Sequence, residues 1–426
     1  MKPVLQLALD FVDLDRALKV AEEAKDYVDW IEAGTPLIKS EGLNSVRELR
    51  KKFPNKVIVA DMKVMDAGRI EVEAAAKAGA DVVNVLGAAS DSTIRECIEA
   101  GRNYGVKIIV DLIGVENIVE RAKQIEKLGA DYIGIHIAID EQMLAKSPFE
   151  KIKKVSSAIK IPITAAGGIN SESVVDAINS GASVLIVGGA ITKAEDAKKA
   201  AREIKKTMET GKKVKTKLFK RTTDIREIFK KVSTANISDA MHRIGDLKDI
   251  YAITSEVKMI GPAVTVRTYP GDWAKSVEAI DIANKGDVIV IDAGGIGPAV
   301  WGELATNSSI QKKISGVVID GATRDTEEIR KLDFPVFTKF ITPCAGEPRG
   351  LGEINIPVKI SDVTVKPGDW IVGDDDGVVV IPKEKAVEIA NRAMDVLERE
   401  NRIRKEIRKE KSTLSKVTHL LKWEKK

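Results

Sequence analysis

Cysteine, histidine and aromatic residues are scarce in this chain. Its 426 residues include two cysteines, Cys97 and Cys344, and three histidines, and Phe, Trp and Tyr together make up 4%. Two cysteines so far apart form no disulfide framework, which favours a reducing compartment. No apolar run approaches the roughly 18 residues of a membrane-spanning helix, and Met1 is followed by a strand-like segment rather than a secretory signal. We therefore expect a cytoplasmic protein without a membrane segment.

An excess of charge of one sign is also missing. The chain has 68 basic and 64 acidic residues, and the resulting net charge of +4 is small for its length. Because the two signs are interspersed, the sequence gives no support to a nucleic-acid-binding surface. A content of 44% hydrophobic and 31% charged residues is typical of globular proteins. A chain of this length exceeds one ordinary core, so we predict two domains.

Short β-branched runs alternate with helix-like segments in the first half. Eight such runs end before about residue 190: PVLQLALD, VDWIEAG, VIVADMK, VVNVLG, KIIVDLIG, YIGIHIA, IPITAAGG and VLIVGGA. They are apolar on both faces, as expected for a parallel sheet covered by helices. The echo KAGADVVNV, KLGADYIGI and NSGASVLIV places Gly79, Gly129 and Gly181 at helix ends, where a left-handed residue is needed. We predict a (β/α)8 TIM barrel over residues 1–209.

Ionisable residues stand at the ends of five of these runs: Asp10, Glu32, Asp61 with Lys63, Asp111, and His136. Chemistry in such barrels takes place at these strand ends, and burying so many charges together is costly unless they are paired or bind a cation. Glu32 and Asp61 offer the hard oxygen ligands that suit Mg²⁺ or Mn²⁺. Lys63, next to Asp61 and Asp66, should stay charged and stabilise a developing oxyanion. A lone Asp-x-Lys or a lone histidine is more often an ordinary structural feature, but this context favours catalysis, with His136 moving protons.

Paired glycines follow the last two runs. Gly167 and Gly168 come after the seventh, and Gly188 and Gly189 after the eighth. A single Gly-Gly is usually only a turn. At these two strands of a barrel, however, exposed backbone N–H groups form the usual phosphate site. The substrate is therefore predicted to be a sugar phosphate.

Several stretches resemble the 3-hexulose-6-phosphate synthase branch of the orotidine-monophosphate decarboxylase suprafamily. They are LALD, WIEAGTPLIKSEG, DMKVMDAG, VLGAASDSTI, VDLIG, HIAIDEQ and AAGGIN. The resemblance implies a Mg²⁺-dependent aldol addition of formaldehyde to D-ribulose 5-phosphate and its reversal, with Asp10, Asp61, Lys63 and Asp111 in the site. It also implies a dimer in which Asp66 reaches into the neighbour's site. A 3-keto-L-gulonate-6-phosphate decarboxylase is the alternative, against which Asp111 argues because the decarboxylase has Glu there.

The second half follows a different pattern. The basic stretch TGKKVKTKLFKRTTD reads as a linker at residues 210–221. Mixed strands and turns then predict a layered α/β domain over residues 222–390. A mixed-charge helical tail is expected at residues 391–426, packed by its apolar stripe.

Two stretches of the second domain carry candidate chemistry. Gly294 and Gly295 follow one strand, and Arg324 and Asp325 end another. Arg324 can clamp a carboxylate and Asp325 can hold a divalent metal, although an isolated Arg-Asp pair is more often a surface ion pair.

The motifs STANISDAM, GPAVTV, WGELAT, GVVIDGATRD and PGDWIVGDDDGVVVIP resemble the RraA-like family. This implies a trimer or hexamer, and either a Mg²⁺-dependent 2-oxo acid aldolase or decarboxylase or a non-catalytic regulator of a ribonuclease. Glu303 stands where the family's enzymes usually have Asp. For the whole chain, a metabolite-sensing barrel carrying a regulatory module is the competing hypothesis to an enzyme.

Overall fold

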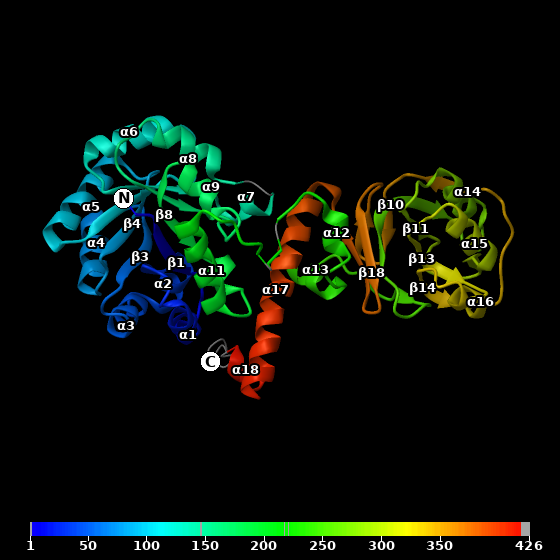
Figure 1. The fold of residues 1–426 in the computed structure, drawn as a ribbon. Coiled ribbons are helices and arrows are strands. Elements are labelled where there is room, and N and C mark those ends of the chain that lie inside the picture. Colours follow the sequence, from blue (N-terminus) through cyan, green and yellow to red (C-terminus); the bar gives the residue numbers. More distant parts are fainter. Residues whose placement is uncertain (1, 145–146, 217, 220, 419–426) are drawn as a thin grey trace. The chain divides into compact units, whose positions relative to one another are not determined.

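The computed structural model describes residues 2–144, 147–216, 218–219 and 221–418 (Figure 1). Its residues group into two compact units. The first lies within residues 1–220 together with 398–426, and the second is Arg221–Leu397. None of the helices in the described ranges has both the length and the hydropathy that crossing a bilayer requires.

The first unit contains the predicted barrel. Eight parallel strands pair in chain order from β1 to β8 and close by the pairing of β1 with β8, which confirms the (β/α)8 fold. The strands are β1 (Val4–Leu9), β2 (Trp30–Ala33), β3 (Val57–Val64), β4 (Val82–Leu86), β5 (Lys107–Asp111), β6 (Tyr132–His136), β7 (Ile163–Ala166) and β8 (Ala182–Val187).

Helices surround this barrel in Figure 1. They are α1 (Leu14–Ala24), α2 (Thr35–Glu41), α3 (Asn44–Lys52), α4 (Gly68–Lys77), α5 (Asp91–Tyr104), α6 (Ile118–Leu128), α7 (Ile139–Met143), α8 (Phe149–Ser156), α9 (Val174–Asn179), α10 (Gly189–Thr192) and α11 (Ala197–Thr210). Gly79, Gly129 and Gly181 have φ angles of 103°, 94° and 110°. The repeated Gly-Ala-Asp/Ser echo therefore does mark helix ends that require a left-handed residue.

The amino-terminal end of the barrel interior is filled by apolar side chains. Trp30 on β2 packs edge-on against Tyr132 on β6, with ring centroids 5.7 Å apart. Val59, Val82, Ile109 and Val184 are the other buried residues of this cluster. Side chains on a strand alternate between its two faces, so the next inward positions toward the carboxyl ends carry the polar residues. Apolar side chains thus fill the barrel at the amino-terminal ends of its strands, and the ionisable groups lie at the carboxyl-terminal ends.

The second unit is built on one mixed sheet. The path runs β19-β18-β10-β11-β13-β14-β9, with parallel pairing from β10 to β14 and antiparallel pairing at both margins. The strands of this sheet are β9 (Tyr251–Ala252), β10 (Met259–Thr268), β11 (Val288–Asp292), β12 (Ala299–Trp301), β13 (Gly316–Thr323), β14 (Val336–Ile341), β15 (Gly352–Ile354), β18 (Trp370–Asp374) and β19 (Gly377–Ile381). A separate two-stranded sheet consists of β16 (Val358–Ile360) and β17 (Val363–Val365).

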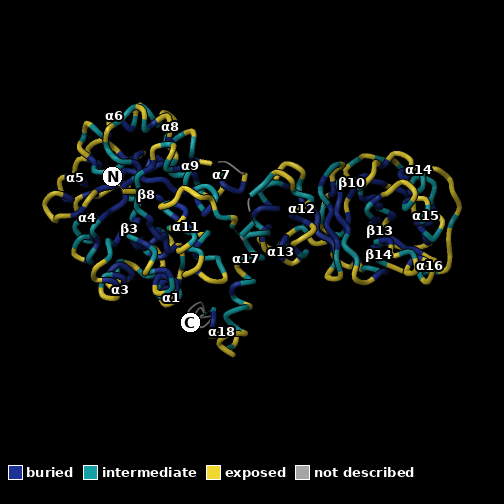
Figure 2. The backbone as a smooth tube through the Cα atoms, in the orientation of Figure 1, coloured by how far each residue is buried: buried dark blue, intermediate teal, exposed yellow. Residues whose placement is uncertain are grey.

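Apolar residues cover both faces of this sheet. Along β11, Ile289 and Ile291 belong to one buried cluster, whereas Val288 and Val290 belong to another. This strict alternation is the reason that β11 reads as a continuous apolar run. The helices of the unit are α12 (Ile225–Phe229), α13 (Thr234–Ala240), α14 (Ala274–Ile282), α15 (Glu303–Gln311) and α16 (Thr326–Lys331). Figure 2 shows the buried backbone along the strands of both units.

A long helix follows β19. After a 3₁₀ turn at Lys383–Lys385, α17 spans Ala386–Glu410, and the short α18 spans Leu414–Val417. The helix therefore begins before residue 391, where the sequence placed the start of the tail. Its residues from Glu398 onward belong to the barrel unit, as does α18.

Candidate active site

The barrel site is built from alternate residues of neighbouring strands. Glu32 pairs in register with Val59 on β3, and the next inward residue of β3 is Asp61. Asp111 ends β5 and lies opposite Gly134 of β6, where a Cβ atom would stand only 3.0 Å from the Asp111 Cα. Glycine at that position leaves room for Asp111, and the following inward residue of β6 is His136.

Glu32 and Asp61 are held by uncharged donors that the sequence reasoning missed. The Gln6 side-chain amide on β1 donates to Glu32 Oε2. Asp61 accepts from Thr35 Oγ1 at 2.7 Å and from Asn84 Nδ2 at 2.9 Å. A polar residue inside an apolar strand, such as Asn84 in VVNVL, was the signal that could have revealed them.

Glu32 is the most strongly perturbed carboxylate of the site. It is 3% exposed. Burial raises its pKa well above the usual range, and the negative charges of Asp61 and Asp10 raise it further, whereas Lys63 and the Gln6 hydrogen bond oppose the rise. A bound cation would stabilise the ionised form of a carboxylate that lies close to two others.

Lys63 lies between two acids. Its Nζ is 3.0 Å from Asp61 Oδ1 and 3.0 Å from Asp111 Oδ2. Burial alone would lower the pKa of Lys63, but the two carboxylates outweigh it, so the pKa lies above its usual value and the ammonium stays charged. Its backbone is left-handed, with φ of 50°, an uncommon conformation for lysine that concentrates at functional sites.

Asp111 connects Lys63 to His136. Its Oδ2 lies 3.3 Å from His136 Nδ1, and its Oδ1 accepts from the Ile113 N–H at 3.0 Å. Burial would raise the pKa of Asp111, but His136 and Lys63 lower it below the usual value. An ionised Asp111 favours the proton on Nδ1 of a neutral histidine, so Nε2 is left as the basic nitrogen.

Asp10 lies at the exposed rim, immediately after β1. Desolvation by the surrounding protein and the charge of Asp61 raise its pKa, against the opposing effects of His136 and Lys63. Two glycines make room for it. A Cβ at Gly34 would meet Asp10 Oδ1 at 2.3 Å, and one at Gly188 would lie 3.3 Å from Oδ2.

Asp66 lies outside the cluster of charged side chains around Lys63. It is exposed, and its carboxylate accepts from the Ala67 N–H, whereas the acids bonded to Lys63 are Asp61 and Asp111. The chain leaves the strand after Val64 and turns through a left-handed Ala67, which directs Asp66 outward. Its role in a neighbouring subunit's site stays a prediction.

The paired glycines lie at the same end of the barrel. Gly167 and Gly168 follow β7 with φ angles of 110° and 70°. A Cβ at Gly167 would stand 2.9 to 3.2 Å from atoms of Ile137. Gly188 follows β8 next to Asp10, and Gly189 begins α10. The two glycine loops therefore follow adjacent strands, as the phosphate prediction requires.

The acids fit a hard divalent cation. Gln6 and Asn84 each donate their amide N–H to a carboxylate, and their oxygens, Gln6 Oε1 and Asn84 Oδ1, are buried without a hydrogen-bond partner among the described residues. Neighbouring carboxylates and orphaned amide oxygens are hard oxygen donors, the kind that Mg²⁺ prefers. In the described ranges, no group of three or more His, Cys, Asp or Glu side chains is arranged so that it could hold a metal ion.

The second unit brings three predicted residues together. Asp325 Oδ2 accepts from the Glu303 N–H at 3.2 Å and lies 3.6 Å from Arg324 Nε. A Cβ at Gly302 would meet the Asp325 carboxylate at 2.6 Å, so glycine is needed there. The Glu303 side chain accepts from Asn307 on its own helix. Arg324 and Asp325 are about half exposed, and both are open to a ligand.

A row of ionisable residues near Gly295 was missed. Arg267, Asp292 and Asp320 lie opposite one another on β10, β11 and β13, and Lys339 Nζ on β14 is 3.5 Å from Asp320 Oδ1. A Cβ at Gly295 would stand 3.1 Å from Lys339 Nζ and 3.3 Å from Asp320 Oδ1. Gly295 thus lies against this row, and the Gly294 N–H donates to Asp292 Oδ1 at 3.1 Å. The signal was the Asp that ends both VIVID and VVID.

Comparisons with known proteins agree with the division into two parts. A family model described as Orotidine 5'-phosphate decarboxylase / HUMPS family matches residues 3–204, and one described as RraA-like: Aldolase/RraA matches residues 234–380. The 3-hexulose-6-phosphate synthase of Bacillus subtilis (strain 168) is 40% identical over 208 residues, which cover 49% of this chain and 99% of the relative.

Two solved structures extend the comparison. The crystal structure of 3-hexulose-6-phosphate synthase from Salmonella typhimurium is 37% identical, covers 49% of this chain and 100% of its own, and has a TM-score of 0.48. The RNA-processing inhibitor RraA from Thermus thermophilis is 27% identical, covers 36% of this chain and 94% of its own, and has a TM-score of 0.34. The chain thus joins an amino-terminal lyase of the aldolase class to an RraA-like domain, and it belongs to the orotidine 5'-phosphate decarboxylase / HUMPS family through the 3-hexulose-6-phosphate synthases.

Proposed function

We propose that the barrel catalyses the Mg²⁺-dependent aldol addition of formaldehyde to D-ribulose 5-phosphate, and its reversal. The observation that carries the proposal is the contact of Lys63 Nζ with both Asp61 and Asp111, 3.0 Å from each, inside a barrel whose relatives are 3-hexulose-6-phosphate synthases. An aldol reaction of this kind needs a base, a fixed cation and a site for the phosphate. The described residues supply a candidate for each.

The proposed chemistry begins with removal of a proton from C1 of the sugar phosphate. His136 Nε2 accepts this proton, since Asp111 holds the histidine through Nδ1 at 3.3 Å. The electrons pass to the C2 carbonyl oxygen and form an enediolate, whose negative charge the Lys63 ammonium stabilises. C1 then attacks the carbon of formaldehyde as the C2 carbonyl re-forms, and the resulting alkoxide takes up the proton held by His136. The glycine loops after β7 and β8 bind the phosphate through backbone N–H groups.

Glu32 and Asp61 would hold the Mg²⁺, with Mn²⁺ as a substitute. The ion, when bound, polarises oxygen atoms of the substrate and lowers the energy of the enediolate. Gln6, Thr35 and Asn84 orient the two carboxylates. Residues that orient metal ligands through hydrogen bonds typically affect metal affinity and activity nearly as much as the ligands themselves.

The direct test is turnover by the purified full chain. We expect consumption of formaldehyde that depends on ribulose 5-phosphate, disappears with EDTA and returns with excess Mg²⁺. Evolution of CO₂ from 3-keto-L-gulonate 6-phosphate, without formaldehyde consumption, would replace the proposal with the decarboxylase. Absence of both activities in folded, Mg²⁺-supplied protein would favour the metabolite-sensing hypothesis.

For the second domain we propose Mg²⁺-dependent cleavage of a 2-oxo acid. Arg324 would bind the substrate carboxylate, and Asp325 would hold the ion with Glu303 nearby. The contact of Asp325 with both the Glu303 N–H and Arg324 supports this role. Glu303 is one methylene longer than the usual Asp, so its carboxylate position decides whether the site is competent.

Arg324→Ala tests this proposal. We expect oxaloacetate decarboxylation to fall by about 100-fold, because the variant loses the charged clamp on the substrate carboxylate. Formaldehyde consumption by the barrel should stay unchanged. Arg243→Ala is the matched control, since Arg243 is an exposed arginine whose ion pair is with Asp239 in the last turn of α13. Equal decarboxylation by wild type and Arg324→Ala, or none by wild type, would favour a regulatory role for the domain.

A further inference from the structure

An arm of residues 398–418 packs on the barrel within the first unit. It consists of the end of α17, α18 and the turn between them. The arm lies far outside residues 3–204, which match the family model, and the B. subtilis synthase is already 99% covered by a match of 208 residues. The arm is therefore an addition to the synthase barrel, and its contacts have no equivalent in that match.

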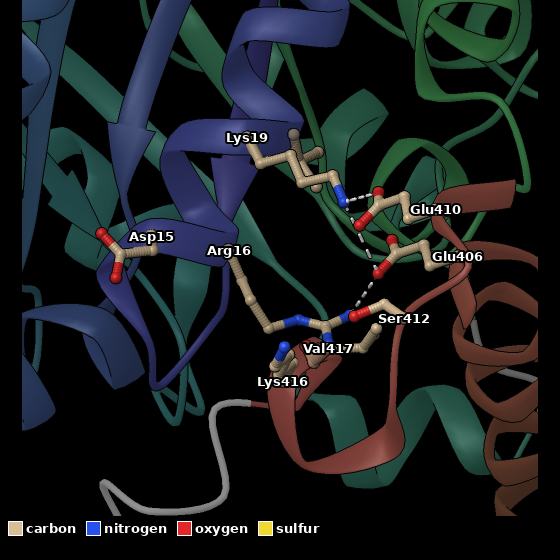
Figure 3. A pocket seen from close by; sticks show the side chains of 9 residues that line it. Asp15, Arg16, Lys19, Glu406, Glu410, Ser412, Lys416 and Val417 are labelled. Atoms are coloured by element: carbon tan, nitrogen blue, oxygen red, sulfur yellow. Dashed lines mark hydrogen bonds and ion pairs between the residues drawn. The ribbon is translucent and has the colours of Figure 1, made fainter.

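The arm contacts α1 through ion pairs, which Figure 3 shows from close by. Arg16 Nη2 is 3.7 Å from Glu406 Oε2, and Lys19 pairs with both Glu406 and Glu410. Arg16 Nη1 also donates to the Val417 carbonyl at 2.7 Å. A cavity of about 210 Å³ remains among these side chains. Partly exposed ion pairs contribute little to stability individually, so their main effect is to fix where the arm lies on α1.

Arg402 is the buried centre of this contact. It is 5% exposed. Its Nε donates to Glu406 at 2.9 Å, its Nη2 lies 3.3 Å from both carboxylate oxygens of Glu23 on α1, and its Nη1 donates to the Ala194 carbonyl at 2.8 Å. A buried guanidinium is tolerated only when its donors are satisfied, and its rigid planar fork holds several partners in one geometry.

The Ala194 carbonyl belongs to the segment that follows β8. The carbonyl groups of Gly188 and Gly189 accept backbone hydrogen bonds from α10 and the residue after it, and the Ala194 N–H donates to the Ile191 carbonyl. Lys405 on the arm donates to the next carbonyl, that of Glu195, at 2.9 Å. The arm thus holds the far end of the short segment whose first residues are the Gly188 and Gly189 loop.

The arm also contacts both sides of the barrel's closing seam. Strand β1 pairs with β8. Glu23 and Arg16 belong to α1, which follows β1, and Ala194 follows β8. At the mouth of the same seam, Asp10 lies beside Gly188. A shift of the segment after β8 would therefore move the Gly188 backbone relative to Asp10.

We propose that Arg402 is a positioning residue for the sugar-phosphate site, through which the arm sets the conformation of the loop after β8. The proposal rests on the proposed function of the barrel and assigns part of its substrate affinity to a segment beyond the RraA-like domain. Arg402 touches no reacting atom. Its effect reaches the substrate through Ala194, α10 and the Gly188–Gly189 backbone.

Kinetics of Arg402→Ala in the full chain test this role. We expect KM for ribulose 5-phosphate to rise by about tenfold, with kcat and KM for formaldehyde within about twofold of wild type, because a loop displaced by about 1 Å weakens phosphate binding and leaves the reacting groups in place. The dissociation constant for inorganic phosphate, measured by calorimetry, should rise in parallel. Arg404→Ala is the matched control, because this exposed arginine contacts Asn401 and Glu400 of its own helix.

A purely structural role predicts a different pattern. Loss of folded protein would lower the apparent kcat and leave KM unchanged, and that result would overturn the proposal. Lys405→Ala, at a half-exposed side chain, covers the case in which Arg402→Ala does not fold. It should raise the same KM by about twofold to threefold, and an unchanged KM would overturn the proposal.

If wild type shows no turnover, the proposed function fails by itself. The dissociation constant for inorganic phosphate then tests the positioning role separately. Equal constants for wild type and Arg402→Ala would overturn that role, and weaker binding by the variant would support it.

Discussion

Replacement of Lys63 by alanine is expected to lower kcat/KM for the aldol reaction by about 10³-fold or more. The variant loses the cation that would stabilise the enediolate, and no other described lysine or arginine contacts both Asp61 and Asp111. It also leaves two buried carboxylates without their ammonium partner. We expect an additional loss of stability, of the order of 3 kcal/mol, measurable as a lower Tm.

The pH dependence of that loss identifies its cause. The folded pKa of Asp111 is lowered by His136 and Lys63. Its contribution to stability is therefore present above the unfolded value of 3.8 and is lost as the pH falls through the folded pKa. The difference in Tm between wild type and Lys63→Ala should shrink at acid pH, where Asp111 is protonated in both.

Lys77→Ala is the control for this pair of measurements. Lys77 forms an exposed ion pair with Glu73 on α4, so its loss should change neither turnover nor Tm appreciably. Turnover of Lys63→Ala within tenfold of wild type would contradict the role of Lys63 in stabilising the enediolate. Lys63→Met retains the length of the side chain without its charge. It gives the same test if the alanine variant unfolds.

Glu32→Gln is expected to abolish Mg²⁺-dependent turnover and at the same time to stabilise the metal-free protein. Burial and the charges of Asp61 and Asp10 raise the pKa of Glu32 well above its unfolded value of 4.5. The favourable, protonated form contributes fully below pH 4.5 and is lost as the pH rises through the folded pKa. Above pH 4.5 the folded wild type must either carry an unfavourable buried charge or take up a proton, and glutamine requires neither. The gain should be about 1–2 kcal/mol.

Thermal unfolding with EDTA and with Mg²⁺ measures this effect. The variant should exceed wild type in Tm at pH 8 with EDTA, and the difference should decrease toward pH 5. Mg²⁺ should raise the Tm of wild type at pH 8 and leave that of Glu32→Gln nearly unchanged, since binding to the folded state is what raises the Tm. Glu48→Gln, at a partly exposed acid on α3, is the control. An equal Mg²⁺ response of wild type and Glu32→Gln would remove Glu32 from the metal site.

Much of the barrel could be predicted because its pattern is local. Each strand is a short apolar run, and the three helix ends with the repeated Gly-Ala pattern carry a glycine. The parallel strands all end at the same edge of the sheet. Placing Asp61, Lys63 and Asp111 at one mouth needed only the order of the strands. The sequence also contained the uncharged donors Gln6 and Asn84, but a polar residue on a buried strand does not reveal which carboxylate it binds.

The amino-acid sequence by itself determined the two-part organisation, the closed barrel and the set of charged strand ends, because these follow from periodicity and strand order. Only the tertiary structure decided that Lys63 pairs with Asp111, 48 residues away, while Asp66 turns outward. It alone placed Arg402 against Ala194, 208 residues earlier in the chain. Such contacts depend on the conformation of a few turn residues and on packing between segments that are distant along the chain. A pattern of residue types along the chain does not encode them locally.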